Sequence, residues 1–246
     1  MAYAALIIWF AYLVYGLTGF GSGLVAVPIL AHFIPLQFVV PYILVLNVSA
    51  SLSMLRNQDM RRQINWPELM PLLPFGIVGM LIGTFMLLNM PQGWLLLGLG
   101  IFILIFGIKN LLGIRGDLLI SKFWAIPAGL LGGTVGALFS TSGPPYVIYL
   151  THRLRDVAQL RSSFSALIML ESGLRLIVFL FAGLILQESM IPALLIAFPL
   201  MWFGLFVGNR IHLSVSRHQL VKIIGMLLTA SGFSLALRSD VLSKLY

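Results

Sequence analysis

The sequence predicts an all-α polytopic membrane protein of two inverted repeats, each a re-entrant helical hairpin followed by three transmembrane helices. Three observations lead to this fold class. Of the 246 residues, 60% are hydrophobic and only 9% are charged, whereas about a quarter of an ordinary soluble domain is charged. Apolar stretches of roughly 20 residues, the length that a helix needs to cross a bilayer, recur along the chain. The third observation is the distribution of Lys and Arg among the loops.

Eight apolar segments follow one another, with connections too short to hold a soluble domain. The first, at about residues 3–33, is interrupted by Gly and Ser at residues 16–23. The fifth, at about residues 122–151, is interrupted by Ser, Gly and Pro at residues 140–145. The uninterrupted segments lie at about residues 38–55, 66–88, 94–112, 160–186, 191–207 and 220–237.

A shift of 120 residues places one interrupted segment on the other. It aligns Gly16 with Gly136, Ser22 with Ser142, Gly23 with Gly143, His32 with His152 and Asn89 with Asn209. Because the matches gather at the two interruptions, they indicate a duplication within a single membrane domain, with repeats over residues 1–120 and 121–246. Paired interrupted helices in two halves are typical of a transporter binding site.

The basic side chains indicate whether the interrupted segments cross the membrane. The loops after segments two, four, five and seven carry three basic residues each, twelve of the 15 Lys and Arg. Eight full crossings, the alternative, would divide these residues equally between the faces, although Lys and Arg gather on the cytoplasmic face. With two re-entrant hairpins, all twelve are cytoplasmic. We therefore expect six crossing helices, hairpins that enter the inner membrane from opposite faces, and both termini in the periplasm.

The composition also excludes several function classes. The chain has no cysteine, and its four histidines lack the spacing of metal ligands, so no metal or other cofactor is expected. The net charge of +8 is assigned to cytoplasmic loops, because no basic run with interleaved aromatic residues indicates nucleic-acid binding. No GxxxxGK[ST] motif indicates nucleotide binding. The lipid bilayer is the expected environment, and the sequence leaves open whether the protein forms a homodimer.

The two hairpin tips are the predicted binding site for a small anion. Each tip lies at the start of a second half-helix, whose unpaired N–H groups and dipole attract negative charge. Re-entrant backbone must be covered by protein or by a water-filled cavity, so the tips are expected to meet near the bilayer midplane. The substrate-binding candidates here are Gly21, Ser22, Gly23, Ser140, Thr141, Ser142 and Gly143. Close helix packing is the alternative role for the glycines.

Three residues of the uninterrupted segments complete the predicted site. Glu171 and Arg175 are four residues apart on one helix face, where they can pair. Charges at membrane depth are costly and indicate function by default. The planar fork of Arg175 suits sulfite, sulfonate or carboxylate oxygens, and Glu171 is the candidate for coupling. Asn47 is expected to line the cavity. A structural ion pair and a helix–helix hydrogen bond are the respective alternatives.

Several stretches, taken in order, resemble one known family. They are residues 16–28 (GLTGFGSGLVAVP), residues 61–66 (RRQINW), residues 132–145 with the end SGPP, and the arginines Arg161 and Arg175. Together they resemble the TauE/SafE family of sulfite and organosulfonate exporters, and the resemblance covers essentially the whole chain. It implies anion transport across the inner membrane. The Gly-Ser-Gly of the first tip and Glu171, where a neutral polar residue is expected, depart from the family pattern.

The combined reading predicts a secondary transporter, an exporter of small anions such as sulfite or organosulfonates. It would work by alternating access, with the substrate held between the tips and with a proton or a sodium ion as the coupling options. One alternative is an anion channel. The other is an intramembrane serine hydrolase with Ser142 as nucleophile and His152 as base, which requires the two side chains to be adjacent. No catalytic residue is predicted otherwise.

Overall fold

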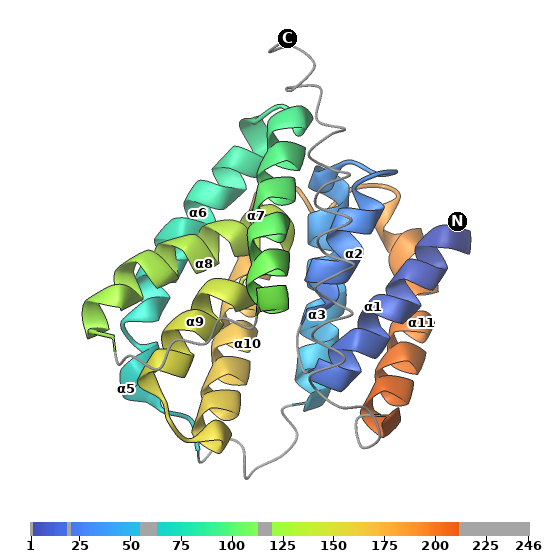
Figure 1. Ribbon diagram of the computed structural model, residues 1–246. Helices are drawn as coiled ribbons and strands as arrows, with labels where there is room; N and C mark the ends of the chain where they lie inside the picture. Colours follow the sequence, from blue (N-terminus) through green and yellow to red (C-terminus); the bar gives the residue numbers. More distant parts are fainter. Residues whose placement is uncertain (1, 19–20, 55–62, 113–119, 212–246) are drawn as a thin grey trace.

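The computed structural model describes residues 2–18, 21–54, 63–112 and 120–211 (Figure 1). Within these ranges every regular element is a helix, which confirms the all-α prediction. The elements are α1 (Ala2–Thr18), α2 (Ser22–Leu30), α3 (Leu36–Met54), α5 (Trp66–Leu69), α6 (Leu72–Asn89), α7 (Gln92–Leu112), η1 (Lys122–Trp124), α8 (Ala125–Phe139), α9 (Gly143–Arg153), α10 (Val157–Phe181) and α11 (Met190–Ile211). The eighth predicted segment lies outside the described residues.

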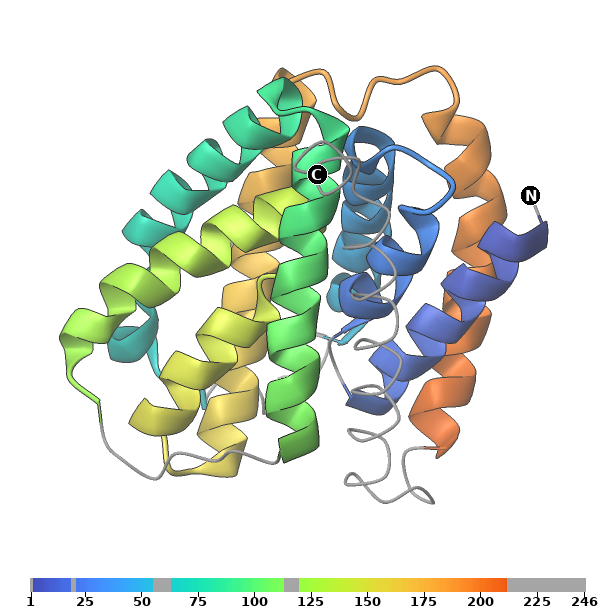
Figure 2. The same cartoon turned by 45° about the horizontal axis from the view of Figure 1, so that its top comes forward.

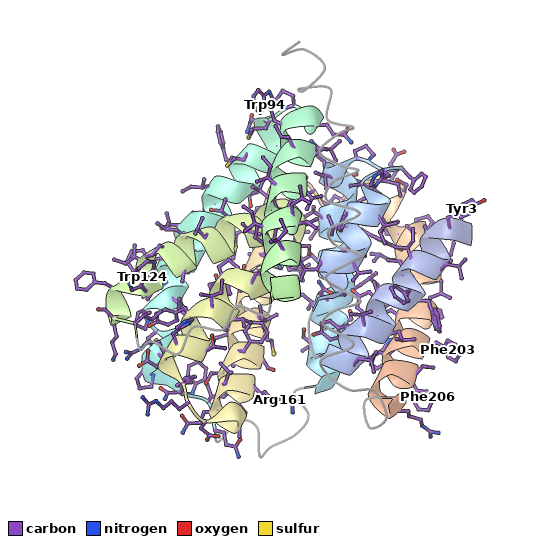
Figure 3. The ribbon with its side chains drawn as sticks, viewed as in Figure 1. Tyr3, Trp94, Trp124, Arg161, Phe203 and Phe206 are labelled. Atoms are coloured by element: carbon purple, nitrogen blue, oxygen red, sulfur yellow. The ribbon has the colours of Figure 1, made fainter. Side chains whose placement is uncertain are left out.

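The helices expose many large apolar side chains and bury a few polar and charged ones among the apolar residues of the core. By length and composition four described stretches can cross a membrane: Trp66–Asn89, Lys122–Phe139, Ala158–Phe181 and Met190–Gly208. Figure 3 shows Phe203 and Phe206 on the outer side of α11, where both are more than half exposed. Glu171 and Arg175 are almost fully buried. Exposed apolar and buried charged side chains suit lipid as the solvent, because lipid tails are as apolar as leucine.

Both interrupted segments form two short helices that pack on each other, α1 with α2 and α8 with α9. The helix boundaries fall at the interruptions read from the sequence. Gly21 precedes α2 with φ 98°, and Ser140 follows α8 with φ 52°. Glycine adopts this left-handed backbone freely, whereas a residue with a side chain pays about 1–2 kcal/mol for it. In Figures 1 and 2, α1 runs downward and inward and α8 runs upward and inward.

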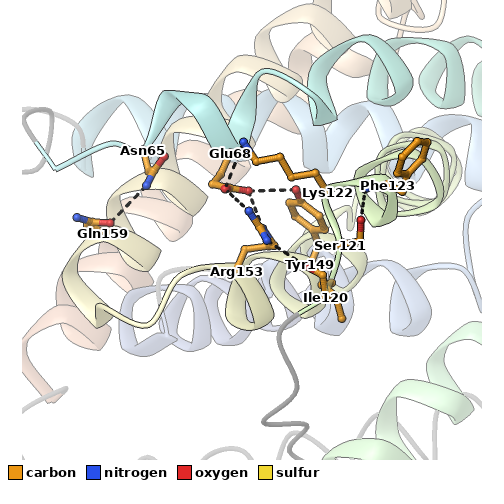
Figure 4. A network of polar contacts seen from close by, with 9 residues as sticks. All are labelled: Asn65, Glu68, Ile120, Ser121, Lys122, Phe123, Tyr149, Arg153 and Gln159. Carbon is orange, nitrogen blue, oxygen red and sulfur yellow. Dashed lines mark hydrogen bonds and ion pairs between the residues drawn. The ribbon is translucent and has the colours of Figure 1, made fainter.

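The start and the end of the α8–α9 segment lie side by side at Glu68 (Figure 4). Arg153, the last residue of α9, donates to both carboxylate oxygens of Glu68, at 2.6 and 2.9 Å. It also donates to the carbonyl oxygen of Ile120, at 3.0 Å, just before η1. Lys122 Nζ lies 4.0 Å from the Glu68 carboxylate, and Tyr149 donates to it at 3.2 Å. The hydrogen bond to Glu68 raises the pKa of Arg153, so the guanidinium stays charged.

Matching glycine contacts join α6 to α8 and α11 to α1. In each pair, a Cβ atom on either glycine of a Gly-x-x-x-Gly motif would overlap a carbonyl oxygen of the facing helix. The contacts are Gly79 with Leu130, Gly83 with Thr134, Gly204 with Trp9 and Gly208 with Leu13. The residues contacted in α8 follow those in α1 by 121 positions, and the α11 glycines follow the α6 glycines by 125. The two contacts are therefore related by nearly constant offsets along the chain. Small residues commonly let helix backbones approach closely in lipid.

Candidate functional site

The tips of the two helix pairs touch each other. Gly23, in the first turn of α2, lies so close to Ser140 that a Cβ atom would overlap the Ser140 carbonyl oxygen. A cavity of about 40 Å³ lies beside this contact, which is space for a few water molecules. All nine substrate-binding candidates border it: Gly21, Ser22, Gly23, Asn47, Ser140, Thr141, Ser142, Gly143 and Arg175. Its other lining residues are Tyr15, Ser51, Ile168 and Ser172.

Both second half-helices begin at this cavity without a side-chain cap. The residue before α2 is Gly21, and Ser142 before α9 makes no capping hydrogen bond. The first N–H groups of a helix have no partner inside the helix and carry the positive end of its dipole. Pro144 and Pro145 remove two such donors from α9. The N-terminus of α2 therefore offers the cavity more N–H groups than that of α9.

Arg175 brings the positive charge to the cavity. Its residue surface is 2% exposed, and its Nε and Nη1 atoms have no hydrogen-bond partner among the described residues. Nη1 lies 3.6 Å from Glu171 Oε1, an ion pair without a hydrogen bond. The buried Ser140 hydroxyl also lacks a partner there. Unused buried donors are costly, and donors of this kind could bind a negatively charged acceptor.

Asn47 fixes the first tip from α3. Its Oδ1 accepts hydrogen bonds from the hydroxyls of Tyr12, at 2.8 Å, and Ser22, at 2.6 Å. The hydroxyls of Tyr15 and Ser51 are 3.0 Å apart and join α1 to α3 in the same way. Because two hydroxyls occupy Oδ1, the amide N–H groups are what Asn47 can offer a ligand. Asn47 thus both lines the cavity and bonds helix to helix. Sequence reasoning missed Tyr12, although a tyrosine in an apolar helix signals a buried partner.

Glu171 lies beside Arg175 but does not border the cavity at the tips. It borders a separate space of about 10 Å³, together with Tyr146 and apolar side chains of α6 and α10. Gly136 of α8 makes room for the pair, since a Cβ atom there would overlap both Arg175 Nη1 and Glu171 Oε1. In the sequence, Gly136 is distinguished only by its alignment with Gly16. The four-residue spacing correctly predicted that Glu171 and Arg175 pair.

Ser142 and His152 are not brought together. Ser142 lies just before α9 and His152 near its other end, about 15 Å along the axis at 1.5 Å per residue. The His152 Nδ1 atom bonds to the carbonyl oxygen of Ile148, at 2.7 Å, within the same helix. A serine nucleophile with His152 as its base therefore has no geometric support. In the described ranges, no group of three or more His, Asp or Glu side chains could hold a metal ion.

Two comparisons with known proteins match this chain. A family model described as "Sulfite exporter TauE/SafE" matches residues 4–235. The probable inner membrane transporter protein TsaS of Comamonas testosteroni is 29% identical over 193 residues, which are 78% of this chain and 81% of the relative. No solved structure matches.

Proposed function

Since the chain belongs to the sulfite exporter TauE/SafE family, we propose that its cavity binds a small anion such as sulfite or an organosulfonate for export across the inner membrane. The chain is a multi-pass inner-membrane transporter and not an enzyme. The substrate, its outward direction and the mechanism are the proposed part. Asn47 and both tips would surround the anion, which would interact most strongly with Arg175.

The observation that carries this proposal is the unsatisfied guanidinium of Arg175 beside the two tips. Two of its nitrogens have unused N–H groups in the described structure, and the cavity adds the Ser140 hydroxyl and the start of α2. Oxyanions accept several hydrogen bonds at once, and a charge-assisted bond to arginine is roughly twice as strong as a neutral one. The site thus offers a cation and several donors to one small acceptor group.

Alternating access between inverted repeats is the mechanism that we propose for transport. Three observations support it: the opposite directions of α1 and α8 in Figure 1, the matching glycine contacts in both halves, and the contact between Ile120 and Arg153. A segment that crossed the bilayer would separate its ends by about 30 Å. The contact between the tips and the small cavity favour an occluded site over the continuous pore of a channel.

Sidedness of single cysteines tests this topology, because the chain has no cysteine of its own. Ser121 comes just before the α8–α9 segment in the chain and Arg155 just after it, and both are exposed. We expect Ser121→Cys and Arg155→Cys to be protected alike from a membrane-impermeant thiol reagent in intact spheroplasts. Glu188→Cys, exposed in the loop before α11, should be labelled. Opposite labelling of positions 121 and 155 would show that the segment crosses the membrane.

Thermal stability of the purified protein against an anion panel tests the proposed binding. Sulfite, sulfate, methanesulfonate and acetate form the panel, with potassium chloride as the ionic-strength control. A ligand that binds only the folded state raises stability with concentration, by about 2.7 kcal/mol at one hundred times its Kd. We expect such a rise with sulfite or methanesulfonate. If every panel anion acts like chloride, the proposed anion site is wrong.

A further inference from the structure

Glu171 is a buried carboxylate whose positive partner also faces the proposed anion site. The Glu171 residue surface is 3% exposed, and neither of its carboxylate oxygens makes a well-formed hydrogen bond among the described residues, although the Ser142 side chain lies beside the carboxylate. Its ion-pair partner is Arg175, with 3.6 Å between Oε1 and Nη1. Arg175 borders the cavity at the tips, whereas Glu171 does not. The Arg175 guanidinium therefore lies between the Glu171 carboxylate and the cavity in which the substrate anion would bind.

The elements packed against α10 bring no second cation to this place in the described structure. Helix α9 contributes Tyr146, which is neutral at physiological pH, and α8 contributes Gly136. On α5, the carboxylate of Glu68 is bound by Arg153. Asn47 and Ser51 of α3 border the cavity at the tips. The side chains that line the space beside Glu171 from α6 are Leu73, Ile77 and Met80. Arg175 and Tyr146 are thus the titratable groups that face Glu171.

Charge balance then changes when an anion binds. In the empty site Glu171 and Arg175 form a neutral pair. A bound sulfonate or sulfate adds negative charge beside the same guanidinium, and an uncompensated buried charge is so costly that a group usually changes protonation instead. The anions of strong acids hold protons weakly, so the proton goes to the carboxylate of Glu171. Anion binding and protonation of Glu171 therefore favour each other.

The surroundings of Glu171 suit a proton better than a metal cation. Hard cations require several oxygen ligands around them. Apart from Glu171, the space of about 10 Å³ is lined by Tyr146, Gly76 and apolar side chains. Its volume is near the lower limit for one water molecule. A proton needs only one carboxylate oxygen.

We propose that the chain takes up a proton at Glu171 with each anion bound beside Arg175 and carries the two across the membrane together. This inference rests on the proposed anion site. The proton adds to a Glu171 carboxylate oxygen when the anion enters and leaves to water when the anion is released. Arg175 stays charged throughout and compensates the anion while Glu171 is neutral.

The pH dependence of binding follows from this exchange. At low pH, Glu171 is already protonated in the empty protein, so the apparent Kd for an anion of constant charge does not change. At higher pH the empty protein holds Glu171 ionised, and binding must take up a proton. The apparent Kd should then rise tenfold for each pH unit. The rise ends where the anion-bound form also loses the proton.

Isothermal titration calorimetry of the full chain in detergent measures both effects. Methanesulfonate and sulfate are the probes, because their charge is constant while a carboxyl group titrates. Titrations in two buffers of different ionisation enthalpy give the protons taken up, and we expect about one per methanesulfonate in the tenfold-per-unit range. Glu171→Gln should take up none and bind with a Kd independent of pH. Glu188→Gln, a matched change at an exposed carboxylate, should behave as the wild type.

The outcomes separate this inference from the function on which it rests. Binding to the wild type without proton uptake at any pH would overturn the coupling and leave the anion site intact. Proton uptake that persists in folded Glu171→Gln would also overturn it. If that variant does not fold, the proton count of the wild type decides. If neither probe binds the folded wild type at any pH, the coupling proposed for anions of strong acids is overturned, and if sulfite also fails to stabilise the protein, the anion site itself is refuted.

Discussion

Replacement of Arg175 by Gln is expected to abolish anion binding and transport while the protein stays folded. Removing one partner of a buried charged contact to a ligand costs about 2–5 kcal/mol, so the affinity should fall by about 30-fold or more. Gln has no charge and lacks the forked donor geometry. Glu171 loses its partner in the variant, but it can become neutral by protonation, which limits the cost to folding. Sulfite-dependent melting temperature and uptake into proteoliposomes measure the effect.

A matched substitution separates the loss of this arginine from a general loss of positive charge. Arg155 is exposed in the loop before α10, and Arg155→Gln should keep the wild-type affinity and transport rate. Far-UV circular dichroism and the melting temperature without anion check that both variants are folded. Unchanged sulfite affinity in folded Arg175→Gln would show that the guanidinium does not hold the anion.

Replacement of Gly23 by Ala should separate the two tips. The added Cβ atom would overlap the carbonyl oxygen of Ser140, which is backbone and cannot rotate away as a side chain can. Overpacking of this kind costs about 1–3 kcal/mol of folding free energy. Because Ser140 and Gly23 both border the cavity, anion binding should be lost or strongly weakened as well. Melting temperature and sulfite affinity measure the two effects.

Gly173→Ala is the control for the added methyl group. No atom lies within 4 Å of the Cβ position at Gly173, and alanine is about 0.5–1 kcal/mol better than glycine inside a helix. This variant should therefore be at least as stable as the wild type and should bind sulfite equally well. If Gly23→Ala behaved like Gly173→Ala, the tips would not be in contact where the structure places them.

Local chemistry made the interruptions and the candidate site predictable. Glycine and proline are strong signals for a helix break, and α2 and α9 begin where the sequence suggested. The pairing of Glu171 with Arg175 follows from one helical turn. The contact between the two tips followed from requiring cover for broken helices inside a membrane, and Arg175 was selected because a charge at membrane depth is costly. These inferences depend on nearby residues or on a general constraint of lipid.

Contacts between distant segments could not be read in the same way. Tyr149 and Arg153 donate hydrogen bonds to the Glu68 carboxylate, and no regular spacing along the chain predicts that contact. The glycine motif at Gly79 is visible in the sequence, but nothing there shows that it faces Leu130. The 120-residue shift aligned the tip motifs, whereas the glycine contacts relate α1 to α8 by 121 residues. The topology prediction relied in part on Arg56 and Arg115, and both lie outside the described residues.

The position of a bound oxyanion is measured most directly by anomalous X-ray diffraction from crystals grown with selenate. Selenate has the shape of sulfate, and its selenium gives a signal that no atom of the native chain matches. We expect a selenium peak in the cavity between the tips, with selenate oxygens within hydrogen-bond distance of the Arg175 guanidinium and the first N–H groups of α2. Selenate that stabilises the protein but gives its peak elsewhere would contradict an anion site between the two tips.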